Sequence, residues 1–366
     1  MKILVLSENY STKEKISQAF IHTRNVEYMK KGILVDVISF AANNKYEYEG
    51  INVYSEKDFY NERKIEEYDI IVSHAPNIRN HCKFINKNAN KIKKIVFFFH
   101  GHEVLISKEI YPKPYKFVKK EKFLKETIRN IYDKMKLKYL KRFFNKFIDI
   151  STYIFVSEWM YEQFKKNIKI KESKYKDISY IIYNSLGEKF LKETYDDTKE
   201  KKYDFITIRN ILDVSKYSID LVNDIAKKYP KYKFLVVGKG EFFKHNDAPS
   251  NLKYELKNLN HDEIIKYLNE SKYALMPTRA DAQGVMMCEM ATFGISLITS
   301  NIYVCKKVLG DLENVRFIEN DINKVDLDAT IEGLKKSKVK TKKFSYDNTI
   351  LKEIDIFNKI LNKKEE

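Results

Sequence analysis

The chain has 366 residues, of which 43% are apolar, and its 68 Lys and Arg against 51 Asp and Glu give a formal net charge of +17. This length and apolar content support a globular protein with two α/β domains. The positive charge predicts an acidic partner, and composition leaves this open between anionic lipid, polyanionic glycan, nucleotide and nucleic acid.

Cysteine spacing and hydropathy exclude further classes. The three cysteines, Cys82, Cys288 and Cys305, are odd in number and widely spaced. This excludes a zinc or CxxC motif and indicates reduced thiols in a cytoplasmic protein. No apolar run approaches the roughly 20 residues of a membrane helix, and the N-terminal Met-Lys-Ile-Leu-Val is read as a first strand rather than a signal peptide. We therefore expect a protein that is soluble or peripheral to a membrane.

Short apolar runs alternate with helical or loop segments through the first half of the chain. We expect a helix near residues 16–31 and strands at residues 2–7, 35–40, 51–54, 70–73, 95–100, 152–156 and 178–183. Such runs predict a parallel sheet with helices on both faces, and ligands gather beyond the carboxyl ends of its strands. His74 and His100 lie at two of these ends.

His100 opens the sequence His100-Gly-His102-Glu103, which invites a metal interpretation. Ile106 stands where a zinc protease requires its second histidine, so we exclude that class and expect no metal site. Sequence alone leaves His100 open between a strand-end histidine bonded to backbone and a functional side chain.

The segment from Lys113 to Phe147 is strongly basic, with thirteen Lys or Arg residues against three acids. Its apolar residues recur every three or four positions, as on one helix face: Leu124, Ile128, Ile131, Met135 and Tyr139. Such a helix either packs this face on the core, leaving a solvated basic back, or lies on an anionic membrane. Nucleic acid is the least expected partner, because no recognisable binding module accompanies the charge.

The second half of the chain repeats the alternation of strands and helices. We expect strands at residues 204–208, 232–237 and 252–256, and helices at residues 218–228 and 261–269. Arg209 follows the first strand and Lys216 comes soon after it. An Arg offers a fork of donors to two oxygens and a Lys a mobile point charge, although both residues also suit a plain surface. Gly238 opens a Gly-Lys-Gly turn after the second strand, and Leu259 follows the third.

A strand, a loop, a helix and a second strand follow one another between residues 273 and 299. The apolar run at 273–276 ends at Pro277, a polar loop leads to Gly284, and the helix expected at 285–293 stops at Gly294. A helix that opens behind a glycine points free N–H groups and the positive end of its dipole into a crevice, which suits a phosphate.

Two acids frame that helix, Asp281 in the loop before it and Glu289 about one turn inside it. Spacing alone leaves them open between solvated acids and ligands for sugar and ribose hydroxyls. The stretch resembles the C-terminal signature of the family-4 retaining glycosyltransferases of GT-B fold (glycosyl transferases group 1). In that signature an acid, seven intervening residues and a glutamate lead into a small-residue helix, a glycine and a strand. The resemblance spans nearly the whole chain, but only residues 281–294 are specific.

The resemblance implies a role for each candidate residue. Glu289 would hold the ribose hydroxyls, Asp281 the donor sugar, and His100 would face that sugar from the N-terminal domain. The donor diphosphate would be held by Arg209, Lys216 and the backbone N–H groups of Gly284, Val285 and Met286. Gly238 and Leu259 would lie near the nucleotide.

The implied fold is GT-B, in which two doubly wound Rossmann-like domains face each other across a cleft and a C-terminal helix crosses back to the N-terminal domain. The expected parts are an acceptor-binding domain at 1–185, a nucleotide-sugar-binding domain at 186–345 and the terminal helix at 346–366.

The implied activity moves a hexose from a nucleotide diphosphate sugar, a UDP-sugar, to a hydroxyl of a glycan or lipid-linked glycan in bacterial surface polysaccharide synthesis. It would proceed with retention of configuration and without a metal cofactor, in the cytoplasm or peripherally on the inner face of the cytoplasmic membrane. The alternative is a non-catalytic GT-B protein that binds a partner or an anionic membrane through its basic face.

Overall fold

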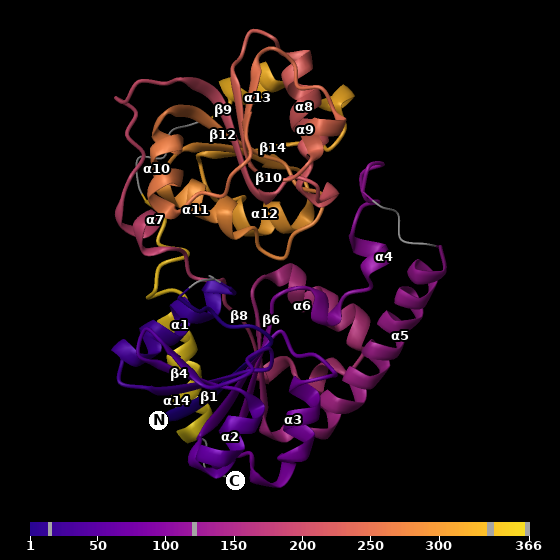
Figure 1. Ribbon diagram of the computed structural model, residues 1–366, viewed down its shortest axis with the longest axis vertical. Coiled ribbons are helices and arrows are strands. Elements are labelled where there is room, and N and C mark those ends of the chain that lie inside the picture. Colours follow the sequence, from indigo (N-terminus) through magenta and orange to yellow (C-terminus); the bar gives the residue numbers. More distant parts are fainter. Residues whose placement is uncertain (14–16, 119–122, 335–339, 363–366) are drawn as a thin grey trace. The chain divides into compact units, whose positions relative to one another are not determined.

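Two parallel sheets flanked by helices organise the chain into two units (Figure 1). The computed structural model describes residues 1–13, 17–118, 123–334 and 340–362. Unit 1 takes in Met1–Ser107, Ile128–Ser185 and Lys343–Glu366, and unit 2 takes in Lys108–Thr127 and Leu186–Lys342. The expected pair of parallel-sheet α/β domains is confirmed.

The sheet of unit 1 has eight strands in the order β3-β4-β2-β1-β5-β6-β7-β8, and only the β3·β4 pair at its edge is antiparallel. Strand β3 was not predicted, because this three-residue Tyr-Glu-Tyr strand is only half-buried and carries no apolar signal. The strands are β1 (Lys2–Ser7), β2 (Leu34–Ser39), β3 (Tyr46–Tyr48), β4 (Ile51–Tyr54), β5 (Ile70–His74), β6 (Ile95–Phe99), β7 (Ser151–Phe155) and β8 (Ser179–Ile181).

Helices cover both faces of this sheet, as the alternation along β6 shows. Phe98 is buried in the cluster that includes α1 and α14, whereas Phe97 and Phe99 contact Phe144 of α5 from the other side. The helices of this part of the chain are α1 (Ala19–Lys30), α2 (Glu56–Glu62), α3 (His81–Lys87), α4 (Ser107–Ile110), α5 (Phe123–Lys146), α6 (Glu158–Ile168) and α14 (Ile350–Asn362).

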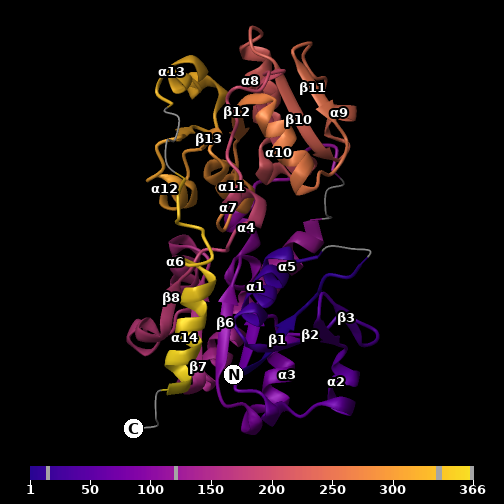
Figure 2. The ribbon, with the colours of Figure 1, turned by 90° about the vertical axis from the view of Figure 1, so that its left-hand side faces the viewer.

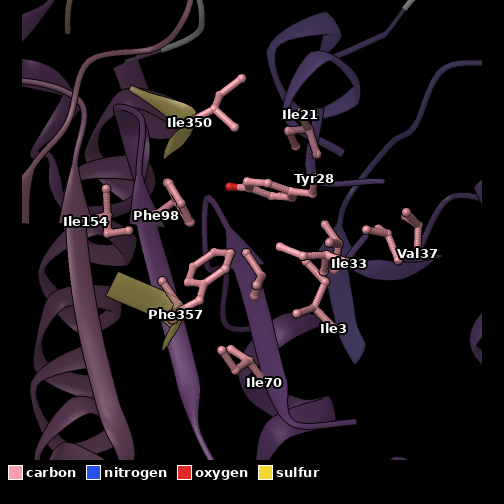
Figure 3. Packing of buried hydrophobic residues seen from close by; sticks show 14 of the residues in the cluster. Ile3, Ile21, Tyr28, Ile33, Val37, Ile70, Phe98, Ile154, Ile350 and Phe357 are labelled. Carbon is pink, nitrogen blue, oxygen red and sulfur yellow. The ribbon is translucent and has the colours of Figure 1, made fainter. Parts of the chain in front are cut away.

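The C-terminal helix α14, yellow in Figure 2, packs in the core of unit 1 as expected. Ile350 and Phe357 are buried with Tyr28 of α1 and Phe98 of β6 (Figure 3). Arg24 donates from Nε to Glu353 Oε1 at 2.9 Å, and both side chains are fully buried. Tyr28 also donates its hydroxyl to Glu353. Burial raises the pKa of Glu353, and Arg24 opposes that shift.

Helix α5 presents the predicted apolar face to solvent rather than to the core. Ile128, Ile131, Met135 and Tyr139 are exposed, and the side chain of Leu124 lies outside the described residues. A second apolar set, Leu137, Leu140, Phe143, Phe144 and Phe147, is buried on the sheet instead. The alternative in which the predicted face packs on the core is therefore wrong.

Unit 2 has a wholly parallel sheet of six strands in the order β11-β10-β9-β12-β13-β14. Its strands are β9 (Tyr203–Ile211), β10 (Phe234–Lys239), β11 (Leu252–Glu255), β12 (Ser271–Met276), β13 (Ser296–Ser300) and β14 (Val315–Ile318). Its helices are α7 (Glu188–Lys192), α8 (Ile219–Lys228), α9 (Phe242–His245), α10 (His261–Asn269), α11 (Val285–Phe293), α12 (Tyr303–Leu309) and α13 (Leu327–Glu332). Strand β14 was not predicted, since its central Arg316 and Phe317 are only half-buried.

One segment packs away from its neighbours in sequence. Residues 108–127 group with unit 2, although the chain on either side of them belongs to unit 1. Tyr115 and Phe117 pack on the hydrophobic cluster of α8, β9 and β10. The predicted first domain, 1–185, includes this segment, because no local pattern in the sequence indicates that it packs with unit 2.

Candidate active site

The loop between β12 and α11 is shaped by Asp281 and Gly284. Asp281 Oδ1 accepts backbone hydrogen bonds from Ala282 at 2.8 Å, Gln283 at 3.3 Å and Gly284 at 2.9 Å. Gly284 has a φ of 76°, and a Cβ there would lie 2.0 Å from Met287 Cε, so the position requires glycine. The N–H of Gly284 is therefore already used in a hydrogen bond to Asp281 Oδ1.

The first turn of α11 keeps further donors at the carboxyl edge of the sheet. Val285 and Met286 are half-buried, and as the first residues of a helix their N–H groups have no intrahelical acceptor. Of the three N–H groups that the sequence assigned to a phosphate, two therefore remain suited to one, together with the helix dipole.

Glu289 lies in the second turn of α11 and is 6% exposed. Gly187 donates its backbone N–H to Glu289 Oε1 at 3.2 Å, and burial raises the pKa of this carboxyl to about 7. A Cβ at Gly187 would lie 2.6 Å from His261 Cε1, so a side chain here would disturb the approach to Glu289. Gly187 was not among the site residues predicted from the sequence.

Arg209 lies within β9, and only 7% of it is exposed. Its Nη2 donates to the carbonyl of Pro277 at 2.8 Å, which ties the end of β9 to the end of β12. Its buried Nε has no hydrogen-bond partner among the described residues. Burial lowers the pKa of the guanidinium, and the nearby charge of Asp281 opposes this shift.

Lys216 lies on a 3-10 turn, Ser215–Tyr217, that is fastened to the loop after β12. Its carbonyl accepts from the N–H of Arg279 at 2.7 Å and from the hydroxyl of Thr278 at 3.0 Å. Its ammonium lies 4.9 Å from the ring centroid of Tyr217, whose ring is also 4.8 Å from Arg209 Cζ. These contacts bring the loops of Arg209, Lys216 and Asp281 together.

Gly238 lies against the backbone of Arg209, whereas Leu259 lies in a loop. A Cβ at Gly238 would lie 2.1 Å from the carbonyl oxygen of Arg209 and 2.8 Å from Leu212 Cδ2, so glycine lets β10 approach the backbone of Arg209. The β9·β10 register shifts between Val237 and Lys239 at the same point. Leu259 is half-buried in the loop before α10. A nucleotide contact for either residue stays a prediction.

His100 follows β6 in unit 1, and its Nε2 lies 3.0 Å from His74 Nδ1. Burial lowers the pKa of both histidines well below the usual value, so the pair is neutral and one ring donates to the other. Glu103 Oε1 accepts from the N–H of His100 at 2.8 Å and its Oε2 from the N–H of Gly101 at 2.6 Å. Glu103 thus positions His100, a role that the sequence analysis did not assign.

Tyr115 is a further residue of this region that was not predicted from the sequence. Its hydroxyl accepts from the N–H of Ile219 at 3.1 Å, at the first turn of α8, and donates to Asp220 Oδ1 at 3.0 Å. Arg279 donates two hydrogen bonds to the same carboxylate, both at 2.8 Å. The segment that contains Tyr115 therefore braces the loops after β9 and β12.

Three further observations concern a cavity, metal binding and membrane-spanning helices. A cavity of about 370 Å³ lies near the opposite end of α11, beside Tyr195, Lys201 and Gly294, and none of the predicted site residues lines it. In the part of the chain that the structure describes, no three His, Cys, Asp or Glu side chains are grouped to hold a metal ion. No described helix is long and apolar enough to cross a bilayer. The expected metal-independent reaction stays a prediction.

Comparison with known proteins gives a family match and a fold match. The model of the family "Glycosyl transferases group 1" matches residues 197–349, whereas no curated protein matches the chain in sequence. A glycosyltransferase from Rickettsia africae superimposes with a TM-score of 0.68 at 14% identity, over 99% of each chain.

Two ligand-bound structures are also similar to this chain. Anabaena HepE in complex with UDP and glucose has a TM-score of 0.59 at 12% identity, covering 99% of this chain and 92% of that one. The catalytic domain of Arabidopsis thaliana starch synthase IV, bound to ADP and acarbose, has a TM-score of 0.60 at 11% identity over 99% of each chain. These likenesses show the fold.

Proposed function

We propose that this chain, whose residues 197–349 match the glycosyl transferases group 1 and whose fold is GT-B, moves a hexose from a UDP-sugar to a hydroxyl of a glycan or lipid-linked glycan. The acceptor would serve bacterial surface polysaccharide synthesis, and the sugar would keep its anomeric configuration. No metal cofactor takes part in the proposed reaction.

The arrangement around Arg209 carries the proposal. A buried guanidinium with an unused Nε costs free energy unless a further acceptor arrives. It lies at the carboxyl edge of a parallel sheet, where the turn of Lys216 is fastened to the loop leading to α11. Two cations and a helix N-terminus at such an edge favour a diphosphate.

Glu289 supports the nucleoside part of the donor. Its carboxylate is buried, and its one described hydrogen bond comes from Gly187, so it retains acceptor capacity for ribose hydroxyls. Ionisation at a pKa of about 7 gives a group that a bound diol would stabilise in its charged form. UDP in the Anabaena structure supports uridine as the base to test first.

The proposed transfer needs no protein nucleophile. The bond between the anomeric carbon and the β-phosphate oxygen breaks, and its electron pair stays on the phosphate. The acceptor hydroxyl oxygen bonds to the same face of the anomeric carbon and gives its proton to the leaving phosphate. Arg209, Lys216 and the N–H groups of Val285 and Met286 would stabilise the negative charge that develops on the phosphate. Asp281, through its second oxygen, would contact the donor hexose, and His100 stays a predicted donor-facing residue.

The test measures UDP binding and UDP release from UDP-hexoses by the purified chain. Wild type is expected to gain about 2.7 kcal/mol of stability from UDP at one hundred times its dissociation constant. Arg209→Ala should lose that gain and nearly all turnover. Lys272→Ala is the matched control, because Lys272 lies near the amino end of β12 and pairs with Asp204.

The measurements of UDP binding and of turnover together distinguish the possible outcomes. Loss of binding and turnover in Arg209→Ala but not in Lys272→Ala supports the donor site. Stabilisation by ADP or GDP in place of UDP would refute the choice of base alone. UDP binding with no turnover on any UDP-hexose and glycan would favour the non-catalytic alternative. Wild-type turnover in Arg209→Ala would refute the site.

A further inference from the structure

Helix α5 carries an apolar stripe that the fold of unit 1 does not use. Twelve large hydrophobic residues are exposed among the described residues, and five of them lie on this helix. They are Ile128 at 56%, Ile131 at 54%, Tyr132 at 45%, Met135 at 66% and Tyr139 at 37% exposure. Spacings of three and four residues place them in one stripe, which we call the α5 stripe. Single exposed hydrophobic residues are ordinary, whereas such a cluster marks an interaction surface.

The opposite side of α5 already anchors the helix. Phe144 is fully buried, and its ring centroid lies 5.2 Å from that of Phe97 on β6. Leu137 and Leu140 are buried on the same side. Asp133 is buried as well and is paired with Lys136 at 3.0 Å. The helix therefore stays in place without help from the stripe, and the stripe is free to meet a partner.

Exposed cations border the α5 stripe along one side. Lys134, Lys138, Lys141 and Arg142 are exposed, and none forms an ion pair with a described residue. Asp133, the one acid of the helix between residues 127 and 146, does not reach this surface. Figure 1 shows α5 along the border of unit 1. A stripe of this kind beside unpaired cations has the chemistry of a helix lying in the interface of an anionic bilayer.

We infer that the α5 stripe and its border of Lys134, Lys138, Lys141 and Arg142 dock unit 1 on an anionic lipid bilayer. Ile128, Ile131 and Met135 enter the boundary between headgroups and acyl chains, and the cations meet lipid phosphates. The tyrosines suit the same depth, because each has an apolar ring and a polar hydroxyl. A second copy of the chain fits less well, since two such surfaces would bring like charges together.

The test is sedimentation of the full chain with vesicles, without donor or acceptor, so it is independent of the proposed transfer. Phosphatidylcholine vesicles containing about one third phosphatidylglycerol should bind the chain at least about tenfold more tightly than phosphatidylcholine alone, and high salt should weaken binding. The double variant Ile131→Ser, Met135→Ser should weaken binding about tenfold or more, because it lacks two apolar side chains that the wild type buries in the bilayer. Each Lys→Ala change at 134, 138 or 141 should weaken binding about fivefold.

Two matched controls guard against general effects. Leu34→Ser removes another exposed aliphatic side chain, 65% exposed at the start of β2, and Lys57→Ala removes an exposed lysine on α2. Both should bind vesicles as wild type does. Equal binding to both lipid compositions, no binding, or unchanged binding of the stripe variant would overturn the inference. A wild-type dimer that becomes a monomer in the stripe variant would assign the stripe to a second copy and also overturn it.

Discussion

Replacing Glu289 by Gln should stabilise the protein and at the same time weaken its binding of nucleotide. Burial raises the pKa of this carboxyl from 4.5 to about 7, so the folded state binds the proton more tightly than the unfolded state does. Between these two pH values the unfolded chain ionises first, and the free energy of unfolding falls by about 1.4 kcal/mol per pH unit. Above pH 7 the wild type therefore carries a cost of about 3 kcal/mol that a neutral Gln does not carry.

The variant keeps the local geometry, because the Gln oxygen can still accept the N–H of Gly187. We expect the stability difference in favour of Glu289→Gln to grow from pH 5 to pH 8 and then level off near 3 kcal/mol. Urea unfolding followed by circular dichroism measures this difference. Trp159, the one tryptophan of the chain, lies on α6 of unit 1, and its fluorescence should report no change in that unit.

Nucleotide binding should move in the opposite direction. If ribose hydroxyls donate to the ionised carboxylate, wild type should bind UDP about tenfold more weakly at pH 6 than at pH 8, since the carboxyl is mostly protonated at the lower pH. Glu289→Gln should bind UDP weakly at both pH values, as measured by titration calorimetry. Parallel stability curves for the two proteins, or wild-type UDP affinity in the variant, would refute this reasoning.

Two further substitutions test the supports of each unit. Gly238→Ala should lower the midpoint of thermal unfolding and weaken UDP binding together, because its Cβ would lie 2.1 Å from the carbonyl of Arg209; Gly333→Ala, at a φ of −76°, should change neither measurement. Arg24→Ala should destabilise unit 1 by about 3–5 kcal/mol, measured by Trp159 fluorescence, because it leaves Glu353 buried and unpaired. The double change Arg24→Met, Glu353→Leu should recover much of that loss, and a double variant as unstable as the single one would contradict the explanation.

Local chemistry explains which elements the sequence predicted well. Helix α10 begins at His261 as expected, because Asn260 accepts from the N–H of Glu263 and Glu263 accepts in return from the N–H of Asn260. Helix α11 matches its predicted bounds, 285–293, because glycines in left-handed conformation stand at both ends. In both cases the residues that set the boundary are neighbours in the chain.

Contacts between distant residues explain the misses. Helix α5 has two apolar faces, and the sequence gives no sign that Phe97 of β6 would bury the one around Phe144 rather than the predicted one. Tyr115 reaches α8 across about a hundred residues, and Gly187 reaches Glu289 across a similar distance. The hydrogen bond between Arg209 and Pro277 also joins residues that are distant in the chain. Spacing finds a helix face or a strand end, but it does not report which distant partner will arrive there.

The packing of α14 on unit 1 has a consequence for how the protein folds during its synthesis. Arg24 is synthesised before Glu353, its buried partner, and the two are separated by 329 residues. At about 5–20 residues per second, Arg24 waits roughly 15–65 seconds for that carboxylate. Throughout this time all of unit 2 emerges while the surface that α14 will cover stays open. Of the two units, the one whose synthesis begins first is therefore completed after the other.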